Sequence, residues 1–197
     1  MASPSGRPIR TEVLELAEST IQRVGVNGFS YGDLARELGI KAPSIHHHFA
    51  TKDELVAEVA ERYRAAFAER VGDIATTDPH AAIRAFADLF VHTAQAERMC
   101  LCGSMSADWA SVGERSRRTV ARFFDDQRTW LCERLDGAVG IGAGAEIGAL
   151  DSDEAAMLLL ATLEGAVLLS RAGEDPALAR RLIDAQLRIW SPQATTG

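Results

Sequence analysis

The sequence has few of the residues that cross-link small folds or bend helices: only 3 of its 197 residues are Cys and 6 are Pro. The odd number of cysteines indicates free thiols, which fits the reducing cytoplasm. The scarcity of proline leaves room for long helices. Apolar runs fall short of the roughly 20 residues that cross a bilayer, and the first residues lack the apolar segment of a secretory signal. We therefore expect a cytoplasmic protein with no membrane partner.

Positive charge is also scarce, since 21 Lys/Arg against 28 Asp/Glu give a net charge of −7. This balance argues against a protein that coats nucleic acid over its whole surface. Residues 1–55 hold 6 Lys/Arg and 7 Asp/Glu, so the N-terminal part is nearly neutral at −1. Any nucleic-acid binding there has to come from a local patch.

Motifs that mark common enzyme sites are missing as well. The sequence has no H-E-x-x-H, no G-x-S-x-G and no P-loop. The glycine-rich stretch at 136–153 does not follow G-x-G-x-x-G, and no predicted strand precedes it, so we interpret it as a flexible link. We expect a protein that is not an enzyme and that needs neither cofactor nor metal.

What the sequence does contain is helical periodicity. Apolar residues recur at i, i+4 from Ile9 to Val24, and the alternation typical of strands is not found. With 47% hydrophobic residues, a chain of this length can bury a sizeable core. We predict an all-α fold. The expected helices cover 9–24, 31–38, 42–49, 51–75, 81–97, 100–110, 115–135, 154–171 and 176–190.

Two of these helices, 31–38 and 42–49, are short and are joined by a glycine turn. Ser30 stands where an N-cap belongs, and Gly39 suits the left-handed conformation that ends many helices. Two short helices joined in this way are typical of a helix-turn-helix.

The second short helix has two different faces. At 100° per residue, Ala42, Ile45 and Phe49 share one face and can pack on the preceding helix. The opposite face is nearly free of large aliphatic residues and rich in hydrogen-bonding groups, as expected of a recognition helix in a major groove. This outward face carries Pro43, Ser44 and His47.

Three consecutive histidines, His46 to His48, lie in this helix. Neighbouring helical residues point 100° apart, so three in a row cannot chelate one metal ion from one face. Their position inside a motif excludes a purification tag. DNA contact by at least one histidine and a merely solvated face remain as alternatives. By direction His47 is the best candidate for contact, whereas His48 leans toward the core.

The segment GFSYGDLARELGIKAPSIHHHFATKDELVAEV, residues 28–59, resembles the DNA-binding segment of the TetR family of one-component transcriptional regulators. The close match covers roughly the first 55 residues. It departs from the family at His46, where tyrosine is usual, and at Lys41, where a capping serine or threonine is usual. The matching positions are Gly28, Phe29, Ser30, Leu34, Ala35, Gly39, Ile45, Phe49, Lys52 and Leu55.

The resemblance implies a homodimer that binds a palindromic operator in double-stranded DNA and is released by a small-molecule effector. We expect a three-helix DNA-binding domain over 1–55 and a larger helical domain for effector binding and dimerisation over 56–197. A repressor is the expected role, and a helical adaptor that has lost DNA binding is the alternative. Candidate DNA-contacting residues are Ser30, Tyr31, Lys41, Ala42, Pro43, Ser44, His46, His47 and Lys52.

The helix expected at 154–171 is apolar on nearly every side, so it needs a packing partner on each. We expect it to form a four-helix interface with the last helix and the same pair from a second subunit. A single core within a monomer is the alternative. Candidate interface residues are Leu159, Leu163, Val167, Leu178, Leu182 and Ile189.

Aromatic and sulfur-containing residues lie between the two ends of the chain and can line an apolar effector pocket, although plain core packing explains them equally. Cys100 and Cys102 are either buried thiols or thiols that react with electrophiles, provided that their pKa is lowered. Candidate pocket residues are Phe67, Phe86, Phe90, Met99, Cys100, Cys102, Met105, Trp109, Phe123 and Gln127.

Overall fold

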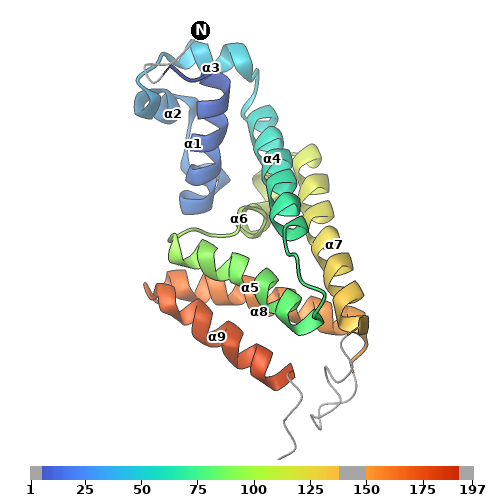
Figure 1. The fold of residues 1–197 in the computed structure, drawn as a ribbon. Helices are drawn as coiled ribbons and strands as arrows, with labels where there is room; N and C mark the ends of the chain where they lie inside the picture. The colour runs from blue at the N-terminus through green and yellow to red at the C-terminus, as the bar shows by residue number, and fades with distance from the viewer. Residues whose placement is uncertain (1–5, 138–149, 191–197) are drawn as a thin grey trace, which may run out of the picture. The chain divides into compact units, whose positions relative to one another are not determined.

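The computed structural model describes residues 6–137 and 150–190 (Figure 1). Within them the fold is all-helical, as predicted. The glycine-rich link lies mostly outside the described residues. The elements are α1 (Ile9–Val24), η1 (Val26–Gly28), α2 (Tyr31–Leu38), α3 (Ala42–His48), α4 (Lys52–Gly72), α5 (Pro79–Gln95), α6 (Leu101–Ala107), η2 (Trp109–Ser111), α7 (Glu114–Gly137), α8 (Ser152–Ala172) and α9 (Pro176–Trp190).

Some helix boundaries differ from the predicted ones. α5 begins at Pro79 because Asp78 caps it, accepting hydrogen bonds from the backbone N–H groups of His80 and Ala81 at 3.2 and 3.3 Å. Proline suits the next position because it has no N–H to satisfy. The single helix predicted over 100–110 is instead α6 followed by the short 3₁₀-helix η2.

The chain divides into two compact units. Unit 1 comprises residues 1–69 and 100–123, and unit 2 comprises residues 70–99 and 124–197. Counted over the sequence, unit 1 holds 12 Lys/Arg and 12 Asp/Glu, whereas unit 2 holds 9 and 16. The whole net charge of −7 therefore belongs to unit 2. Unit 1 extends well beyond residue 55, and the boundary at 55 stays a prediction about function.

In unit 1, helices α1, α2 and α3 pack around a shared apolar core (Figure 1). Val13, Ile21 and Ile45 have no exposed surface, and Leu34 is only 1% exposed. Each comes from the apolar stripe of its helix, so burial of these stripes positions the three helices.

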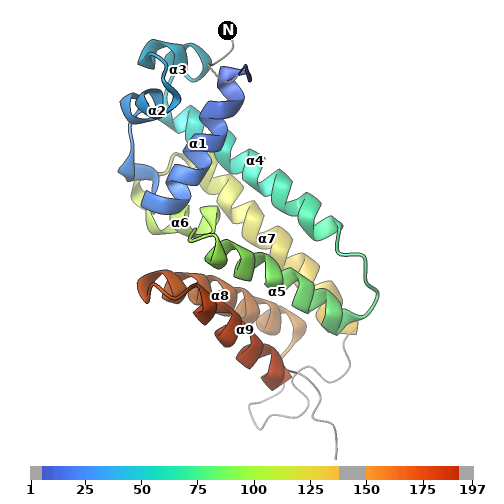
Figure 2. The same ribbon diagram turned by 60° about the vertical axis from the view of Figure 1, so that its left-hand side comes forward.

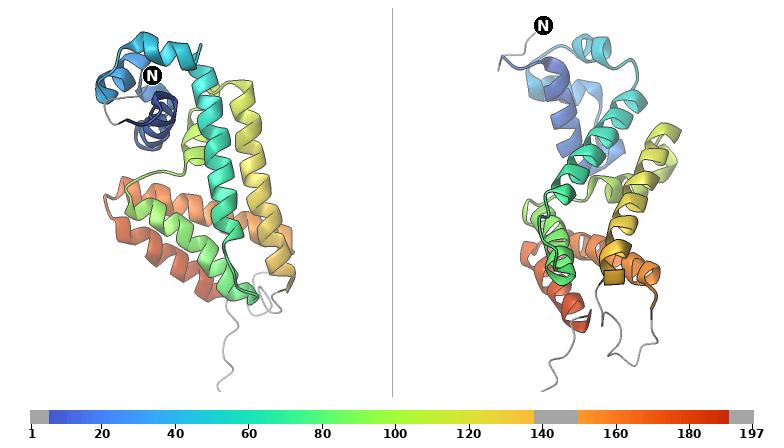
Figure 3. Two further views of the ribbon diagram at one scale, coloured as in Figure 1. Left: turned by 45° about the horizontal axis from the view of Figure 1, so that its top comes forward. Right: turned by 45° about the vertical axis from the view of Figure 1, so that its right-hand side comes forward.

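The first part of α7 runs beside α4 in the same unit (Figure 3). The ring of Phe123 meets those of Tyr63 and Phe67, with centroids 5.6 and 5.0 Å apart. The Thr119 hydroxyl donates a hydrogen bond to the Glu61 carboxylate at 3.0 Å. An apolar cluster and a side-chain hydrogen bond thus hold these helices together.

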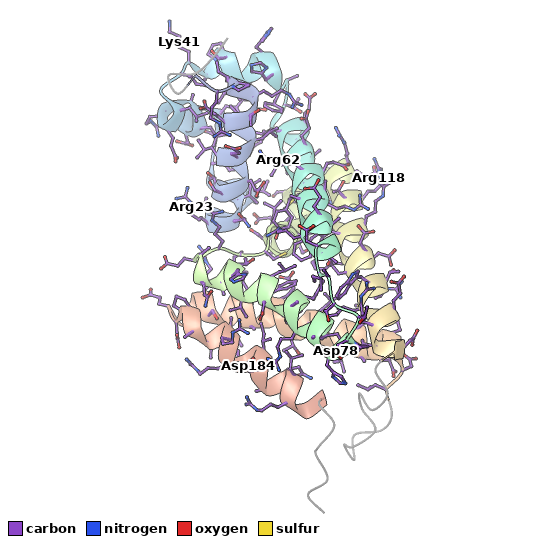
Figure 4. All side chains as sticks on the ribbon, viewed as in Figure 1. Arg23, Lys41, Arg62, Asp78, Arg118 and Asp184 are labelled. Carbon is purple, nitrogen blue, oxygen red and sulfur yellow. The ribbon has the colours of Figure 1, made fainter. Side chains whose placement is uncertain are left out.

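Unit 2 is built on α5, α8 and α9, which contact one another pairwise (Figure 2). Leu159 and Leu163 of α8 and Ile183 of α9 are fully buried, as is Phe86 of α5. Two ion pairs join α5 to α9: Arg180 with Asp88 at 2.6 Å, and Arg84 with Asp184, which Figure 4 labels, at 3.1 Å. Exposed pairs contribute little, so the apolar contacts dominate.

Helix α8 is long and apolar enough to cross a membrane by length and composition alone, with a mean hydropathy of 1.6 over its most apolar window. The core helix of a soluble protein passes the same test. Here 44% of that window is buried against the rest of the chain. The packing on α5 and α9 therefore accounts for one side of α8 and leaves the other side to be explained.

Candidate nucleic-acid interface

Local hydrogen bonds fix the start of α2, and a glycine ends it before α3. Ser30 caps α2 through a reciprocal capping box, in which its hydroxyl accepts from the Asp33 N–H and the Asp33 carboxylate accepts from the Ser30 N–H at 2.9 Å. The Ser30 hydroxyl also donates to the Asp33 carboxylate at 2.6 Å, and this bond, followed by that from the Ser30 N–H, holds the pKa of Asp33 below its usual value. Gly39 ends α2 with a φ of +65°, which favours glycine. The cap and the turn thus set the direction in which α3 leaves.

The two predicted faces of α3 are present. Ile45 and the following Phe49 have no exposed surface, while Pro43, His46 and His47 are exposed. Ala42 and Ser44 are half-buried at the border between the faces. The exposed Lys41 side chain extends away from the unit just before α3 (Figure 4). This surface can donate and accept hydrogen bonds without exposing a large aliphatic group.

The three histidines have different surroundings, as their spacing predicts. The ring of His46 lies edge-on to that of Tyr31, with centroids 4.6 Å apart. His48 is half-buried, and burial, followed by the nearby His47 and Arg10, lowers its pKa. Among the residues that the structure describes, no three His, Cys, Asp or Glu side chains gather to hold a metal ion.

Tyr31 is placed differently from a DNA-contacting residue. Its side chain is buried, and its hydroxyl donates to the backbone carbonyls of Thr51 at 2.6 Å and Phe49 at 3.2 Å. Burial and the nearby Glu54 raise its pKa to about 12. We therefore assign Tyr31 a positioning role, because it fixes the end of α3 to the start of α4. Residue type alone could not separate an inward tyrosine from an outward one.

Lys52 is also turned inward. Its ammonium group donates to the Phe29 carbonyl at 2.5 Å and lies over the Phe29 ring, 4.2 Å from the centroid. Burial lowers its pKa, opposed by attraction to Asp108, Asp33 and Asp53. Lys52 thus ties the first turn of α4 to the residue before the Ser30 cap, a contact that the sequence did not reveal.

The arginines at the start of the chain have partners as well. Arg7 pairs with Glu15 at 2.7 Å, and Arg10 pairs with Glu58 while lying over the ring of Phe49. Glu15 also receives Arg62 of α4 at 3.3 Å, and Figure 4 labels that arginine. Two of these pairs, Arg10 with Glu58 and Glu15 with Arg62, connect α1 to α4.

The predicted effector pocket draws on both units. In unit 1, Trp109 is 43% exposed and lies beneath Arg117, whose guanidinium is 5.3 Å from the ring. The remaining unit 1 candidates are buried: Phe67, Cys100, Cys102, Met105 and Phe123.

In unit 2, Phe86 stacks on Trp130 with centroids 5.1 Å apart, and Phe90 is 2% exposed. Met99 is half-buried. Gln127 is buried, and its side-chain oxygen has no hydrogen-bond partner among the described residues. Among the predicted pocket residues, Gln127 is therefore the one whose buried side-chain oxygen could accept a hydrogen bond from a ligand.

The cysteines are placed as packed thiols. Cys100 and Cys102 are 1% and 0% exposed, and the Tyr63 hydroxyl approaches the Cys100 sulfur at 3.9 Å. Cys132 is half-buried, and burial raises its pKa. Reactive thiols are normally accessible and have a lowered pKa. Effector sensing by Cys100 or Cys102 stays a prediction that this burial does not favour.

The residues predicted for the subunit interface differ in their burial within the single chain. Leu159, Leu163 and Val167 are buried within the single chain, because they form the face of α8 that meets α5 and α9. Leu178 and Leu182 are half-buried, and the side chain of Ile189 lies outside the described part of the chain. The large apolar side chains of α8 that remain exposed are Met157, Leu158, Leu168 and Leu169.

The fold and the α2–α3 geometry define a helix-turn-helix protein with a separate helical C-terminal part, and comparison with known proteins gives the family. Residues 13–59 match the family described as bacterial regulatory proteins, tetR family, and residues 79–184 match the transcriptional regulator LmrA/YxaF-like C-terminal domain. The chain belongs to the TetR family of DNA-binding transcriptional regulators. Members of this family are not enzymes.

Individual relatives agree with this assignment. The chain is 27% identical over 168 residues to the tetracycline repressor protein class A from transposon 1721 of Escherichia coli, covering 84% of this chain and 68% of that protein. A TetR-family regulator from Agrobacterium tumefaciens is 28% identical with a TM-score of 0.81, covering 92% and 97% of the two chains. A TetR regulator from Legionella pneumophila, 24% identical, has the same fold with a TM-score of 0.80 over 94% and 98%.

Proposed function

We propose that the protein is a homodimeric transcriptional repressor that binds a palindromic operator and is released by a small-molecule effector. The observation that carries the DNA-binding part is the division of α3 into a buried face with Ile45 and an exposed polar face with His46 and His47. A helix that reads base edges presents hydrogen-bonding groups outward and is anchored by apolar groups behind. Ser44 and Lys41 are the proposed contacts of this surface with the DNA phosphates.

Dimerisation is supported by one face of α8. At 100° per residue, the exposed Met157, Leu158, Leu168 and Leu169 fall within an arc of about 120°. Ala161 and Gly165 lie between them, and a Cβ built on Gly165 meets nothing within 4 Å. Small residues at the centre of an apolar stripe allow a second helix to approach closely. We therefore move the proposed interface from Leu159, Leu163 and Val167 to this α8 face, with α9 beside it.

Release by an effector is supported by Gln127 of unit 2. A buried acceptor without a partner costs about 1–3 kcal/mol, and an N–H or O–H group on a ligand would satisfy it. Phe86 and Phe90, two buried residues of the same unit, are the proposed apolar contacts of that ligand. An effector that binds better to a conformation with mismatched recognition helices would shift the population away from the operator-bound form.

The repressor role is proposed by analogy with the tetracycline repressor, to which this chain is similar. The test is selection of binding sites from a pool of random DNA duplexes with the full-length protein. We expect recovery of a palindromic sequence that binds two chains per duplex, with affinity that falls as salt is raised. A helical adaptor without DNA binding would enrich no sequence. A recovered site without a palindrome would contradict the dimer.

A further inference from the structure

The C-terminal end of α6 approaches the end of α1 within unit 1 (Figure 2). Asp108 follows α6, and one carboxylate oxygen accepts the backbone N–H of Val26 at 2.7 Å. The other oxygen receives the side-chain amide of Asn27 at 3.4 Å, and that amide also donates to Ser111 at 3.0 Å. The carboxylate therefore binds the short connection that leads from α1 to the helix-turn-helix.

Gly25, which follows α1, lies so close to this carboxylate that a side chain at position 25 would not fit. Gly25 has φ +79° and ψ 174°, a conformation that is essentially restricted to glycine. A Cβ built at this position would lie 2.5 Å from the carboxylate oxygen of Asp108. The close approach of Asp108 thus depends on a residue without a side chain.

A second contact from the same face of α6 lies one turn earlier. The Ser104 hydroxyl donates to the Ile21 carbonyl, near the end of α1, at 3.0 Å. Residues 104 and 108 are four apart, so they lie on the same side of a helix. Ser104 of α6 therefore holds the last turn of α1, and Asp108, just after α6, holds the connection that follows α1.

The connection of residues 25–29 is held from its other end by Lys52, which donates to the Phe29 carbonyl. The next residue is Ser30, the cap of α2. Asp108 and Lys52 thus restrain the two ends of the connection that orients α2 and α3 relative to α1. A hydrogen bond of 2.7 Å is lost when its atoms separate by about 1 Å, so even a small displacement of α6 must move the connection or break the bond.

We propose that Asp108 is the positioning residue through which α6 sets the orientation of the recognition helix, by holding the Val26 N–H. This rests on the proposed DNA-binding function, because the readout is operator affinity. The carboxylate contacts no DNA. It transmits the position of α6 to the α1–α2 connection, and through the Ser30 cap to α3.

The test compares Asp108→Ala and Asp108→Asn with wild type on the duplex recovered by selection, at a temperature where all are folded. Asp108→Ala is expected to weaken operator binding by roughly tenfold or more, since hydrogen bonds to a charged group are among the stronger ones. Asp108→Asn keeps an acceptor for the Val26 N–H and is expected to recover most of that affinity.

Asp78→Ala is the matched control. Its carboxylate likewise accepts backbone hydrogen bonds, from the N–H groups of His80 and Ala81, but it lies at the start of α5 in unit 2. We expect it to lower the melting temperature without changing operator affinity. Hydrogen exchange adds a structural readout: Asp108→Ala should speed exchange in residues 26–29 and in α2 and α3, whereas Asp78→Ala should not.

The outcomes separate two kinds of failure. If wild-type protein recovers no duplex, the proposed function fails. If wild type binds but Asp108→Ala binds within twofold of it, with exchange in α2 and α3 unchanged, then the positioning role is refuted while DNA binding stands. Equal loss of affinity in Asp108→Ala and Asp78→Ala would also refute it, because the effect would then follow general stability.

Discussion

The hydroxyl of Tyr31 donates a hydrogen bond to the backbone carbonyl of Thr51 at 2.6 Å, joining the start of α2 to the residue before α4. The same hydroxyl reaches the Phe49 carbonyl at 3.2 Å. One buried group thus holds the chain on both sides of the turn that follows α3. Removing the Tyr31 hydroxyl should therefore weaken the packing that holds α3 in place, without changing the groups that α3 exposes.

Tyr31→Phe is therefore expected to lower the free energy of unfolding by about 1–2 kcal/mol, since two carbonyls lose a buried donor. Urea denaturation followed by circular dichroism measures this. An unchanged midpoint and slope would show that the hydroxyl contributes nothing to stability.

The same side chain predicts a pH dependence. Burial and Glu54 raise the pKa of Tyr31 to about 12, above the ordinary value of about 10 for the unfolded chain. Because the folded protein holds this proton more tightly, the associated stability is complete below pH 10 and is lost as the pH rises toward 12. Wild type should lose stability over this interval more steeply than Tyr31→Phe. Parallel curves would contradict the assignment.

For Lys52, the sequence and the structure predict different effects of substitution on operator binding. An exposed lysine at a helix start would bind phosphate, so Lys52→Ala would reduce the salt dependence of operator binding by about one unit of slope. The ammonium group instead holds Phe29. We expect Lys52→Ala to lower the melting temperature and to weaken operator binding with little change of slope. Titrations at several salt concentrations measure this, and a full unit of change would favour direct phosphate contact.

Local signals in the sequence predicted most of the helices and the residues that begin and end α2. Ser30, Gly39 and the apolar stripe through Ile45 and Phe49 depend on neighbours within a few residues, and the structure confirms each. Tyr31 and Lys52 were harder, because amphipathic side chains can turn either way and their partners are tertiary.

Helix α8 shows the same limit. A helix that is apolar on every side is predicted to be buried, but its periodicity does not indicate which face packs against its own chain. Leu163 lies on the inner face and Leu168 on the outer one, although both are leucines of one stretch. Asp108 and Val26 are 82 positions apart in the chain. No local sequence pattern predicts a contact between them.

Gly25→Ala is expected to destabilise the protein by more than about 2 kcal/mol, because the residue has a positive φ and its Cβ would meet Asp108. Gly39→Ala is the comparison: its φ is +65°, but a Cβ there meets nothing within 4 Å. In an Asp108→Ala background the cost of Gly25→Ala should fall, since the contact is gone. If Gly25→Ala destabilises the Asp108→Ala protein as much as the wild type, the whole effect comes from backbone strain.

Gly165→Leu tests the subunit interface. The chain leaves space at this position, so the variant should fold, while a leucine at the centre of the exposed α8 face should keep a second α8 away. Analytical ultracentrifugation is expected to show a shift from dimer to monomer at micromolar concentration. Gly72→Ala, also at an open helical position, is the control. A dimer of unchanged stability would place the interface elsewhere.

The account rests most directly on the claim that the exposed face of α3 reads DNA bases, and His47 is the best candidate on that face by its direction on the helix. The measurement is a repeat of the duplex selection with His47→Ala beside wild type. Arg118→Ala, which changes an exposed α7 side chain, serves as the control. We predict that His47→Ala changes or relaxes the base preference at one symmetric pair of operator positions, while Arg118→Ala retains the wild-type sequence. Recovery of the same operator with the same preferences by His47→Ala would contradict this role of His47.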